Sequence, residues 1–303
     1  MQIKIFVDDD KQVKSTPFYR KLSVEFLEKH EIITTNDISN SDVIVCVRPR
    51  SLHKYKDTVI PILVWTHEPR FLLSDKHIDI TDNVEHYVMS VYTNNVFTNN
   101  FYGYQHVELK NVKKTNINKK IVILATYKSM YQKIDADVAH LRCDIAEYFF
   151  ERNMIDIYGA KWPDGMSIEN SRNKFHEVKG GILENYDISL CCENTNWPNY
   201  TTEKIWDAIN AYTLPIYYAN DTIYDIFPEN SFIDLKKFES IADLYNFVQN
   251  LTDDEYNERL NKCINVAMKY KEWESYEKKY YDRDMNIVNK LREIVTTHKK
   301  PTE

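Results

Sequence analysis

The chain has 303 residues, of which 43% are hydrophobic and 28% are charged, the balance of an ordinary globular protein. This length predicts two domains, since single hydrophobic cores rarely grow past about 250–300 residues. The formal net charge of −7 argues against a general nucleic-acid-binding protein, but it still allows a local basic pocket for an anionic ligand.

Short apolar runs rich in β-branched residues recur along the chain and predict strands. They are Ile3–Val7, Asp42–Val47, Ile62–Thr66, Tyr87–Val91, Ile121–Tyr127, Ile155–Gly159, Ile188–Cys192 and Leu214–Ala219. Amphipathic stretches at Pro17–His30 and Asp137–Arg152 predict helices between them. Strands that alternate with helices indicate an α/β protein with parallel sheets covered by helices.

The polar run Lys110–Lys120 is the predicted linker between two α/β halves. We therefore expect one domain at residues 1–115, a second at 116–270 and a helical, heavily charged tail at 271–303. Two such halves predict a cleft between them. In open α/β sheets ligands bind beyond the carboxyl ends of the strands, so functional residues are expected there.

Nothing at the N-terminus resembles a targeting segment. The residues MQIKIFVDDD begin directly as a strand, and no apolar run is long enough to span a bilayer. The five cysteines are odd in number, and two of them, Cys191 and Cys192, are neighbours, which does not suggest a disulfide framework. These features predict a cytoplasmic protein without a transmembrane segment.

Common cofactor motifs are missing from the sequence. The chain has 5 glycines and contains neither G-x-G-x-x-G nor G-x-x-x-x-G-K-[ST], which disfavours a dinucleotide-binding or P-loop protein. It also lacks C-x-x-C and H-E-x-x-H, so no zinc site is expected. A chain of this composition that binds a diphosphate must use helix N-termini, arginine and lysine instead.

The most informative segment reads ISLCCENTNWPNYTTEKIWDAINAYTLPIYYAN. Ile188–Cys192 is predicted as a buried strand, and Glu193 and Asn194 follow at its carboxyl end. Either of the two threonines just ahead of Glu203 can cap a helix that runs to about Ala211. Pro215 is expected to end this helix and to open the next strand.

Lys204 lies in the first turn of that helix, where the helix dipole disfavours a cation. An anion bound at the same helix N-terminus would reverse this effect, because backbone N–H groups and one ammonium suit a diphosphate. Glu203 beside it could accept hydrogen bonds from ribose hydroxyls. The alternative is a solvated Glu-Lys pair on a surface helix.

This segment resembles the donor-binding motif of the α1,3/4-fucosyltransferases, glycosyltransferase family 10. That motif reads approximately F-E-N-(S/T)-x₄-Y-x-T-E-K, followed by a helix and a strand that contains a proline. The residues at matching spacing are Glu193, Asn194, Thr195, Tyr200, Thr202, Glu203, Lys204 and Pro215. Cys192 stands where the family usually has phenylalanine, a change that concerns packing.

The resemblance extends over roughly residues 60–240. Asn220–Leu235 is similar to the family's stretch with a P-x-x-S-F-I pattern. Trp65–Pro69 looks like the family's N-terminal segment that carries the proposed catalytic base. The helix around Arg142 looks like the family's helix with a phosphate-binding arginine.

The resemblance implies a GT-B fold, with two Rossmann-like domains facing across a cleft and a C-terminal helix. Residues 1–115 would then be the acceptor-side domain and 116–270 the nucleotide-sugar-binding domain. The implied reaction transfers L-fucose from GDP-fucose to a hydroxyl of GlcNAc or glucose in a glycan, with inversion at the anomeric carbon. The implied partners are thus GDP-fucose and a glycan acceptor.

The same resemblance assigns candidate site residues. Glu68 would be the catalytic base, with His67 as the competing candidate. The residues expected to bind the donor are Arg142, Glu193, Asn194, Tyr200, Glu203 and Lys204. For Arg142 the alternative is snorkelling at the edge of an apolar helix face, and for Tyr200 it is packing against Trp197.

No essential metal or other cofactor is expected, because Arg142 and Lys204 would supply the positive charge. Two D-x-D patterns, Asp8–Asp10 and Asp135–Asp137, leave open a divalent cation that stimulates the reaction. Two other functions also stay open. One is an inverting GT-B transferase that uses another nucleotide-sugar, and the other is a non-catalytic sugar-binding protein on a transferase fold.

Overall fold

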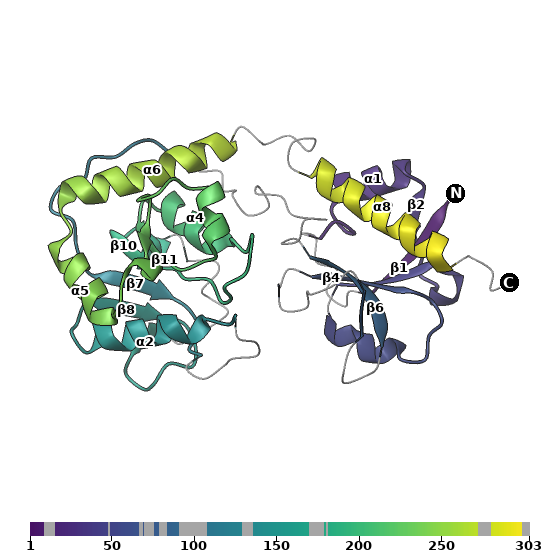
Figure 1. The fold of residues 1–303 in the computed structure, drawn as a ribbon, viewed down its shortest axis with the longest axis horizontal. Coiled ribbons are helices and arrows are strands. Elements are labelled where there is room, and N and C mark those ends of the chain that lie inside the picture. Colours follow the sequence, from purple (N-terminus) through teal and green to yellow (C-terminus); the bar gives the residue numbers. More distant parts are fainter. Residues whose placement is uncertain are drawn as a thin grey trace. The chain divides into compact units, whose positions relative to one another are not determined.

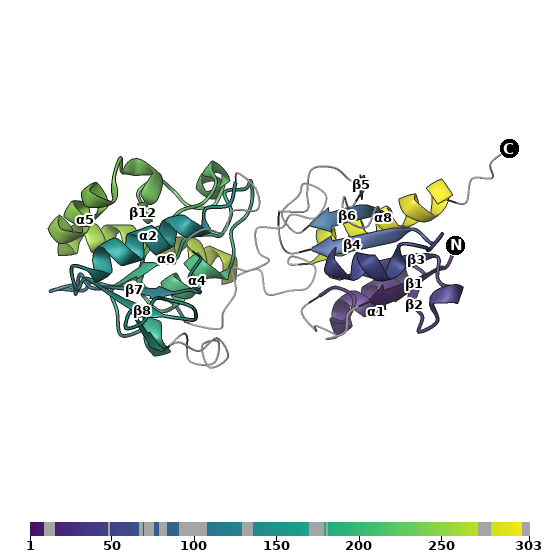
Figure 2. The same ribbon diagram turned by 90° about the horizontal axis from the view of Figure 1, so that it is seen from below.

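The computed structural model describes residues 1–8, 16–47, 49–66, 69, 76–78, 84–90, 108–128, 136–169, 179, 181–271 and 280–298. The chain folds into two units, which Figure 1 and Figure 2 show from two directions. The first comprises Met1–Phe101 together with Glu274–Glu303, and the second comprises Tyr102–Trp273.

The first unit is built on a six-stranded sheet in the order β2-β1-β3-β4-β6-β5. Neighbouring strands are parallel, except that β5 runs antiparallel to β6. The strands are β1 (Ile3–Asp8), β2 (Ile32–Thr34), β3 (Val43–Cys46), β4 (Ile62–Thr66), β5 (Lys76–Ile78) and β6 (Glu85–Ser90). Every residue of β3 and β4 is buried, as expected for parallel strands covered on both faces.

Helix α8 (Tyr281–His298) belongs to this first unit and contacts α1 (Lys21–Lys29), β1 and β3 (Figure 1). Its Arg283 is fully buried, and the Nη2 atom donates to Ser23 Oγ of α1 at 2.9 Å, across 260 positions of sequence. Residues 271–303 were predicted to form a separate helical tail, whereas residues 274–303 belong to the N-terminal unit and α8 packs into its core. The apolar side of α8 is what attaches it there.

The second unit holds a six-stranded parallel sheet in the order β12-β11-β10-β7-β8-β9. Its strands are β7 (Ile121–Leu124), β8 (Ile155–Tyr158), β9 (Ser167–Glu169), β10 (Ile188–Leu190), β11 (Leu214–Tyr217) and β12 (Ile233–Asp234). The chain starts in the middle at β7, moves outward through β8 and β9, and returns to β10 on the other side of β7. This is the Rossmann strand order, and its topological switch point lies between β7 and β10.

The helices of this unit are α2 (Ala139–Phe150), α4 (Glu203–Asn210), α5 (Ile241–Asn250) and α6 (Asp253–Lys271). Helix α2 contacts β8, α4 and α6 contact β11, and α5 contacts α2. Short 3₁₀ helices are η4 (Asp221–Asp225) and η5 (Leu235–Lys237) here, and η1 (Ile38–Asn40) and η2 (Pro49–Tyr55) in the first unit. Of the helices that the structure describes, none is both long and apolar enough to cross a membrane.

The prediction that Pro215 ends the helix after Glu203 is wrong. Helix α4 already ends at Asn210, and Tyr212 then adopts a left-handed conformation with φ of 56°. Pro215 lies inside β11, opposite Ser189 of β10. The reversal at Tyr212, rather than the proline, therefore stops the helix.

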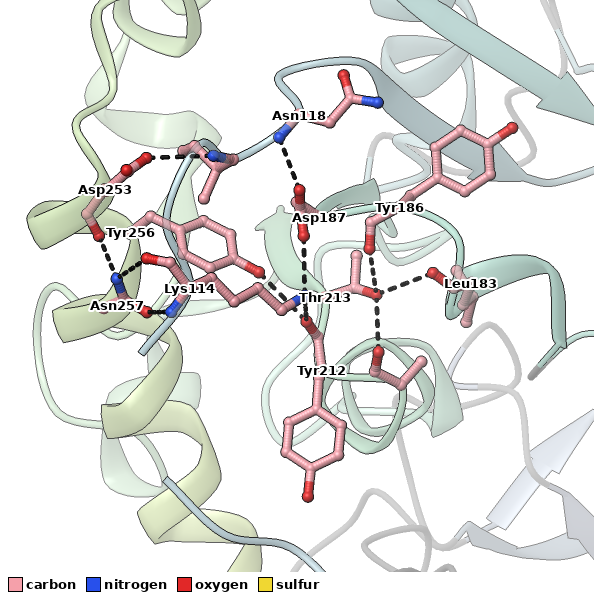
Figure 3. Close-up of polar contacts among 12 residues, drawn as sticks. Lys114, Asn118, Leu183, Tyr186, Asp187, Tyr212, Thr213, Asp253, Tyr256 and Asn257 are labelled. Atoms are coloured by element: carbon pink, nitrogen blue, oxygen red, sulfur yellow. Dashed lines mark hydrogen bonds and ion pairs between the residues drawn. The ribbon is translucent and has the colours of Figure 1, made fainter. Parts of the chain in front are cut away.

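The prediction that Lys110–Lys120 is a linker between the domains is also wrong, because this run lies within the second unit. Asn257 of α6 makes two hydrogen bonds with the backbone of Lys114, at 2.7 and 2.8 Å (Figure 3). Asn261 makes the same pair of bonds with Val112, at 2.8 and 2.9 Å. One turn earlier, Asp253 of α6 accepts from two further backbone N–H groups of the run. These side chains recur every four residues on one face of α6 and bind the run as a neighbouring strand would.

Lys114 also joins this run to the sheet. Its Nζ donates to Asp187 Oδ1 at 2.8 Å and to the carbonyl oxygen of Tyr212 at 3.0 Å (Figure 3). The other carboxylate oxygen of Asp187 accepts from the backbone N–H of Asn118 at 2.7 Å. Residues just ahead of β7, β10 and β11 are thus held together by one polar cluster.

Candidate functional site

A cavity of about 240 Å³ lies at the carboxyl ends of β7 and β10, which is the switch point of the second sheet. Open α/β sheets bind their ligands at such a point. Its lining residues are Leu124, Ala125, Thr126, Lys128, Arg142, Lys179, Leu183, Ser189, Leu190, Cys191, Cys192, Asn194, Glu203 and Lys204. Four of the six residues expected to bind a donor therefore meet here, although they come from three different parts of the chain.

Arg142 projects from α2 into the cavity and is only 5% exposed. Its Nη1 donates to Asn194 Oδ1 at 2.7 Å, and its Nη2 contacts the carbonyl oxygen of Thr126 at 3.4 Å. The Nε atom has no hydrogen-bond partner among the described residues, and no carboxylate there pairs with the guanidinium. A buried cation is costly unless an anion balances it, so this geometry suits an anionic ligand better than snorkelling.

Glu193 is fully buried three residues after the end of β10 and does not line the cavity. Its carboxylate accepts from Thr202 N at 2.8 Å, from Tyr217 Oη at 2.6 Å and from Lys204 Nζ at 2.9 Å. The Thr202 hydroxyl donates to the same carboxylate at 2.9 Å instead of capping α4. Glu193 therefore holds the start of α4 against the sheet, and any influence it has on a ligand runs through Lys204.

Lys204 lines the cavity in the first turn of α4. Sequence reasoning expected a bound anion to balance this cation, but the structure supplies Glu193 at 2.9 Å and Glu203 at 3.7 Å. Burial alone would lower the pKa of Lys204, but the two carboxylates outweigh it and raise the pKa. The side chain is therefore an ammonium, and it stands at the N-terminus of a helix that faces the cavity.

Glu203 is half-exposed at the same edge of the cavity. Partial burial acts to raise its pKa, but Lys204 and Lys179 outweigh this and lower it. Glu203 is therefore a carboxylate at neutral pH, and a carboxylate can accept hydrogen bonds from ligand hydroxyls.

Asn194 and Tyr200 occupy different positions relative to the cavity. Asn194 lines it and bonds Arg142 through its side chain, while its carbonyl oxygen accepts from Val138 N at 2.9 Å. Tyr200 is buried, and its backbone N–H bonds Trp197 O at 3.1 Å. The structure therefore brings Asn194 to the cavity and places Tyr200 inside the packed loop that precedes α4.

The remaining candidates lie mostly outside the described residues. These are Glu68 and His67, together with Asp9, Asp10 and Asp135 of the D-x-D patterns. Asp137 is described, and its carboxylate accepts from the Thr195 hydroxyl at 3.0 Å. Within the described ranges, no group of three His, Cys, Asp or Glu side chains is placed to hold a metal ion.

Sequence reasoning missed two parts of this site, namely the loop after β7 and the ion pair between Lys179 and Asp207. The loop carries no motif, because it contributes the shape of its backbone to the cavity, and residues distant in sequence hold that backbone in place. Trp162 Nε1 donates to Ala125 O at 2.7 Å, and Ala125 N donates to Tyr158 O at 2.9 Å. Lys179 and Asp207 lie 28 positions apart in the chain, so no local pattern indicated their ion pair.

Gly159 allows this loop to approach the end of β8. Its φ is +129°, and a Cβ atom there would lie 2.2 Å from the carbonyl oxygen of Ala125. Gly159→Ala should therefore lower the free energy of unfolding by about 2–5 kcal/mol, from backbone strain and overpacking. Urea unfolding measures this change.

Gly165→Ala is the matched control for that variant. Gly165 also has a positive φ, of +81°, but a Cβ atom added there would meet no described atom within 4 Å. The free energy of unfolding of Gly165→Ala should fall by only about 1 kcal/mol, the cost of the backbone conformation alone. Equal losses in both variants would show that the contact with Ala125 has no effect.

Comparison with known proteins agrees with this geometry. The model of glycosyltransferase family 10 (fucosyltransferase), C-terminal part, matches residues 118–294. An alpha-(1,4)-fucosyltransferase of Arabidopsis thaliana is 31% identical over 95 residues, which cover 31% of this chain and 24% of that protein. The chain thus spans about a quarter of the length of this curated relative.

Two solved structures share the fold. The crystal structure of an alpha1,3-fucosyltransferase with GDP-fucose superposes with a TM-score of 0.51 at 18% identity, covering 100% of this chain and 91% of that one. The DNA-modifying enzyme beta-glucosyltransferase gives 0.52 at 9% identity, covering 95% and 99%. These neighbours confirm the predicted GT-B fold class. Because the family model matches more than half of the chain, the chain belongs to glycosyltransferase family 10, the fucosyltransferases.

Proposed function

We propose that this chain transfers L-fucose from GDP-fucose to a hydroxyl of GlcNAc or glucose in a glycan, with inversion of the anomeric configuration. The observation that carries the proposal is the buried Arg142 guanidinium, which faces a cavity at the β7–β10 switch point without a carboxylate partner among the described residues. Membership of the family supports the choice of sugar. The solved structure of similar fold that contains GDP-fucose supports the choice of nucleotide.

The proposed donor site uses the cavity residues in separate roles. Arg142 and Lys204 contact the diphosphate, whose negative charge grows as it leaves the sugar. Asn194 orients Arg142 through the 2.7 Å hydrogen bond. The first backbone N–H groups of α4 point toward the same anion, and Glu203 accepts from the ribose hydroxyls. These cations take the place of a divalent metal in the proposed mechanism.

Inversion requires one in-line displacement, in which the acceptor hydroxyl loses its proton to a base. We assign this role to Glu68, which follows two residues after β4 and lies outside the described residues. Its position after a strand of a parallel sheet and the resemblance of Trp65–Pro69 support the assignment. His67 is the alternative base.

An acceptor-array assay with GDP-fucose tests the proposal. We expect fucose transfer to glycans that end in or contain GlcNAc or glucose, and we expect the activity to persist in EDTA. Transfer of a different sugar from another nucleotide-sugar would contradict the donor assignment. If the chain binds GDP-fucose but neither transfers the fucose to any acceptor nor hydrolyses the donor, it is a sugar-binding protein instead of an enzyme.

Arg142→Lys should weaken GDP binding by about tenfold or more, because lysine cannot reproduce a forked contact with phosphate oxygens. Calorimetric titration with GDP measures the affinity. Arg152→Lys is the matched control, since Arg152 lies just after α2 and outside the cavity lining. Unchanged GDP affinity in a folded Arg142→Lys variant would remove Arg142 from the donor site.

A further inference from the structure

Lys179 lines the same cavity, but the proposed reaction assigns it no role. Its ammonium forms an ion pair with the carboxylate of Asp207, and the two side chains are only 18% and 9% exposed. Lys179 lies ahead of β10 in the chain, whereas Asp207 belongs to α4. The pair therefore holds the Lys179 ammonium against α4, the helix whose first turn faces the cavity.

This ion pair is a poor way to stabilise the fold. Asp207 is buried, and so are the residues before and after it in α4, Trp206 and Ala208. An apolar residue at this position would avoid the cost of removing a carboxylate from water, and buried pairs often stabilise no more than apolar replacements. What the pair does provide is an ammonium held at one place in the cavity wall.

The position of Asp207 on α4 directs the Lys179 ammonium toward the proposed diphosphate site. Asp207 is one helical turn after Glu203, so the two carboxylates share a face of α4. Lys179 acts electrostatically on both of them. Lys204 acts on the same two carboxylates, and both lysines line the cavity.

The charges around the cavity are ordered in two layers. The lining contains the cations Lys128, Arg142, Lys179 and Lys204, and Glu203 is the one carboxylate among the described residues that line it. Two further carboxylates, Glu193 and Asp207, are buried behind Lys204 and Lys179 and are not part of the lining. Cations in front of carboxylates suit a ligand group that carries more than one negative charge.

We propose that Lys179 is a further donor-binding residue, which contacts the diphosphate of a nucleoside diphosphate, and that Asp207 is the positioning residue that holds it there. This inference rests on the proposed function of the cavity. In the free protein Lys204 is paired with two carboxylates, whereas Lys179 is paired with the single carboxylate of Asp207 within the described part of the chain. A diphosphate would therefore draw on Lys179 and Arg142 as well as on Lys204.

The test removes the pair as a whole, because Lys179→Met alone would take away the ammonium that is paired with a buried carboxylate. Lys179→Met combined with Asp207→Leu replaces both charges by apolar groups, and thermal unfolding checks that this double variant is folded. We expect the affinity for GDP to fall about tenfold or more, and the affinity for guanosine to change less than about twofold. Calorimetric titration with each ligand measures both values.

Two single variants keep the test decisive if the double variant does not fold. Lys179→Gln can still donate a hydrogen bond to Asp207 but carries no charge, so it should show the same selective loss of GDP affinity. Lys179→Arg keeps the charge and should bind GDP within about threefold of the native protein. The matched control is Lys236→Met with Asp221→Asn, which removes an ion pair outside the cavity lining and should leave GDP affinity unchanged.

The outcomes separate this inference from the proposed function. If the native chain does not bind GDP, the proposed function fails. If the native chain binds GDP and a folded double variant or Lys179→Gln binds it equally well, Lys179 is only a structural residue. Equal losses for guanosine and GDP would also overturn the inference, because the contact would then not be with the diphosphate.

Discussion

Glu193→Gln should lower the free energy of unfolding by about 3–5 kcal/mol, the usual cost of removing one partner from a buried ion pair. The carboxylate is fully buried and receives hydrogen bonds from Thr202, Lys204 and Tyr217. A glutamine would place an NH₂ group among these donors and leave the ammonium without its countercharge at 2.9 Å. Chemical denaturation of the native and variant chains measures the difference.

Glu203→Gln is the matched control, since it makes the same chemical change one residue ahead of Lys204. Its side chain is 48% exposed and lies 3.7 Å from the Lys204 ammonium, so the loss should be below about 1 kcal/mol. If the two variants lose equal stability, the hydrogen bonds of the buried Glu193 carboxylate do not hold α4 in place.

Glu68→Gln should reduce kcat by about 10²-fold or more while leaving GDP affinity near normal, because a general base acts on the acceptor and not on the nucleotide. The substitution keeps the shape of the side chain and removes the basic oxygen. Steady-state kinetics with GDP-fucose and an acceptor from the array would give kcat, and calorimetry would give the affinity.

His67→Asn serves as the comparison for this variant. The native rate should rise with pH as the Glu68 carboxylate ionises, and Glu68→Gln should lose that rise. Normal turnover in Glu68→Gln together with a large loss in His67→Asn would transfer the role of the base to the histidine.

The fold could be predicted well wherever apolar runs were long. All eight predicted strands are present, since buried parallel strands read as continuous apolar segments. Of the strands that the structure describes, β2, β5, β9 and β12 were missed, each only 2 or 3 residues long. Strands this short carry almost no pattern of their own; β10 also has 3 residues, but it was predicted because it lies in the longer apolar run Ile188–Cys192.

The linker prediction failed for a similar physical reason. The side chains of the run Lys110–Lys120 are polar because most of them are exposed, as they would be in a linker, but its backbone bonds to side chains of α6, among them Asn257 and Asn261. These partners lie 143 and 149 positions away in the chain, so a local reading had no access to them.

Those residues of the candidate site that belong to a sequence motif could be predicted. Motif spacing identified Asn194, Glu203 and Lys204, and the resemblance of a helix identified Arg142, all of which line the cavity. The enclosure of Glu193 could not be predicted, because Tyr217 approaches it from a neighbouring strand. Lys179 was missed because its relation to Asp207 exists only after folding.

Calorimetric titration of the native chain with GDP and with UDP shows whether the β7–β10 switch point is a guanine-nucleotide site. We expect GDP to bind with a dissociation constant on the order of micromolar and Arg142→Lys to weaken this binding. Binding of UDP with no binding of GDP would show that the cavity is not the donor site of a GDP-fucose-dependent enzyme.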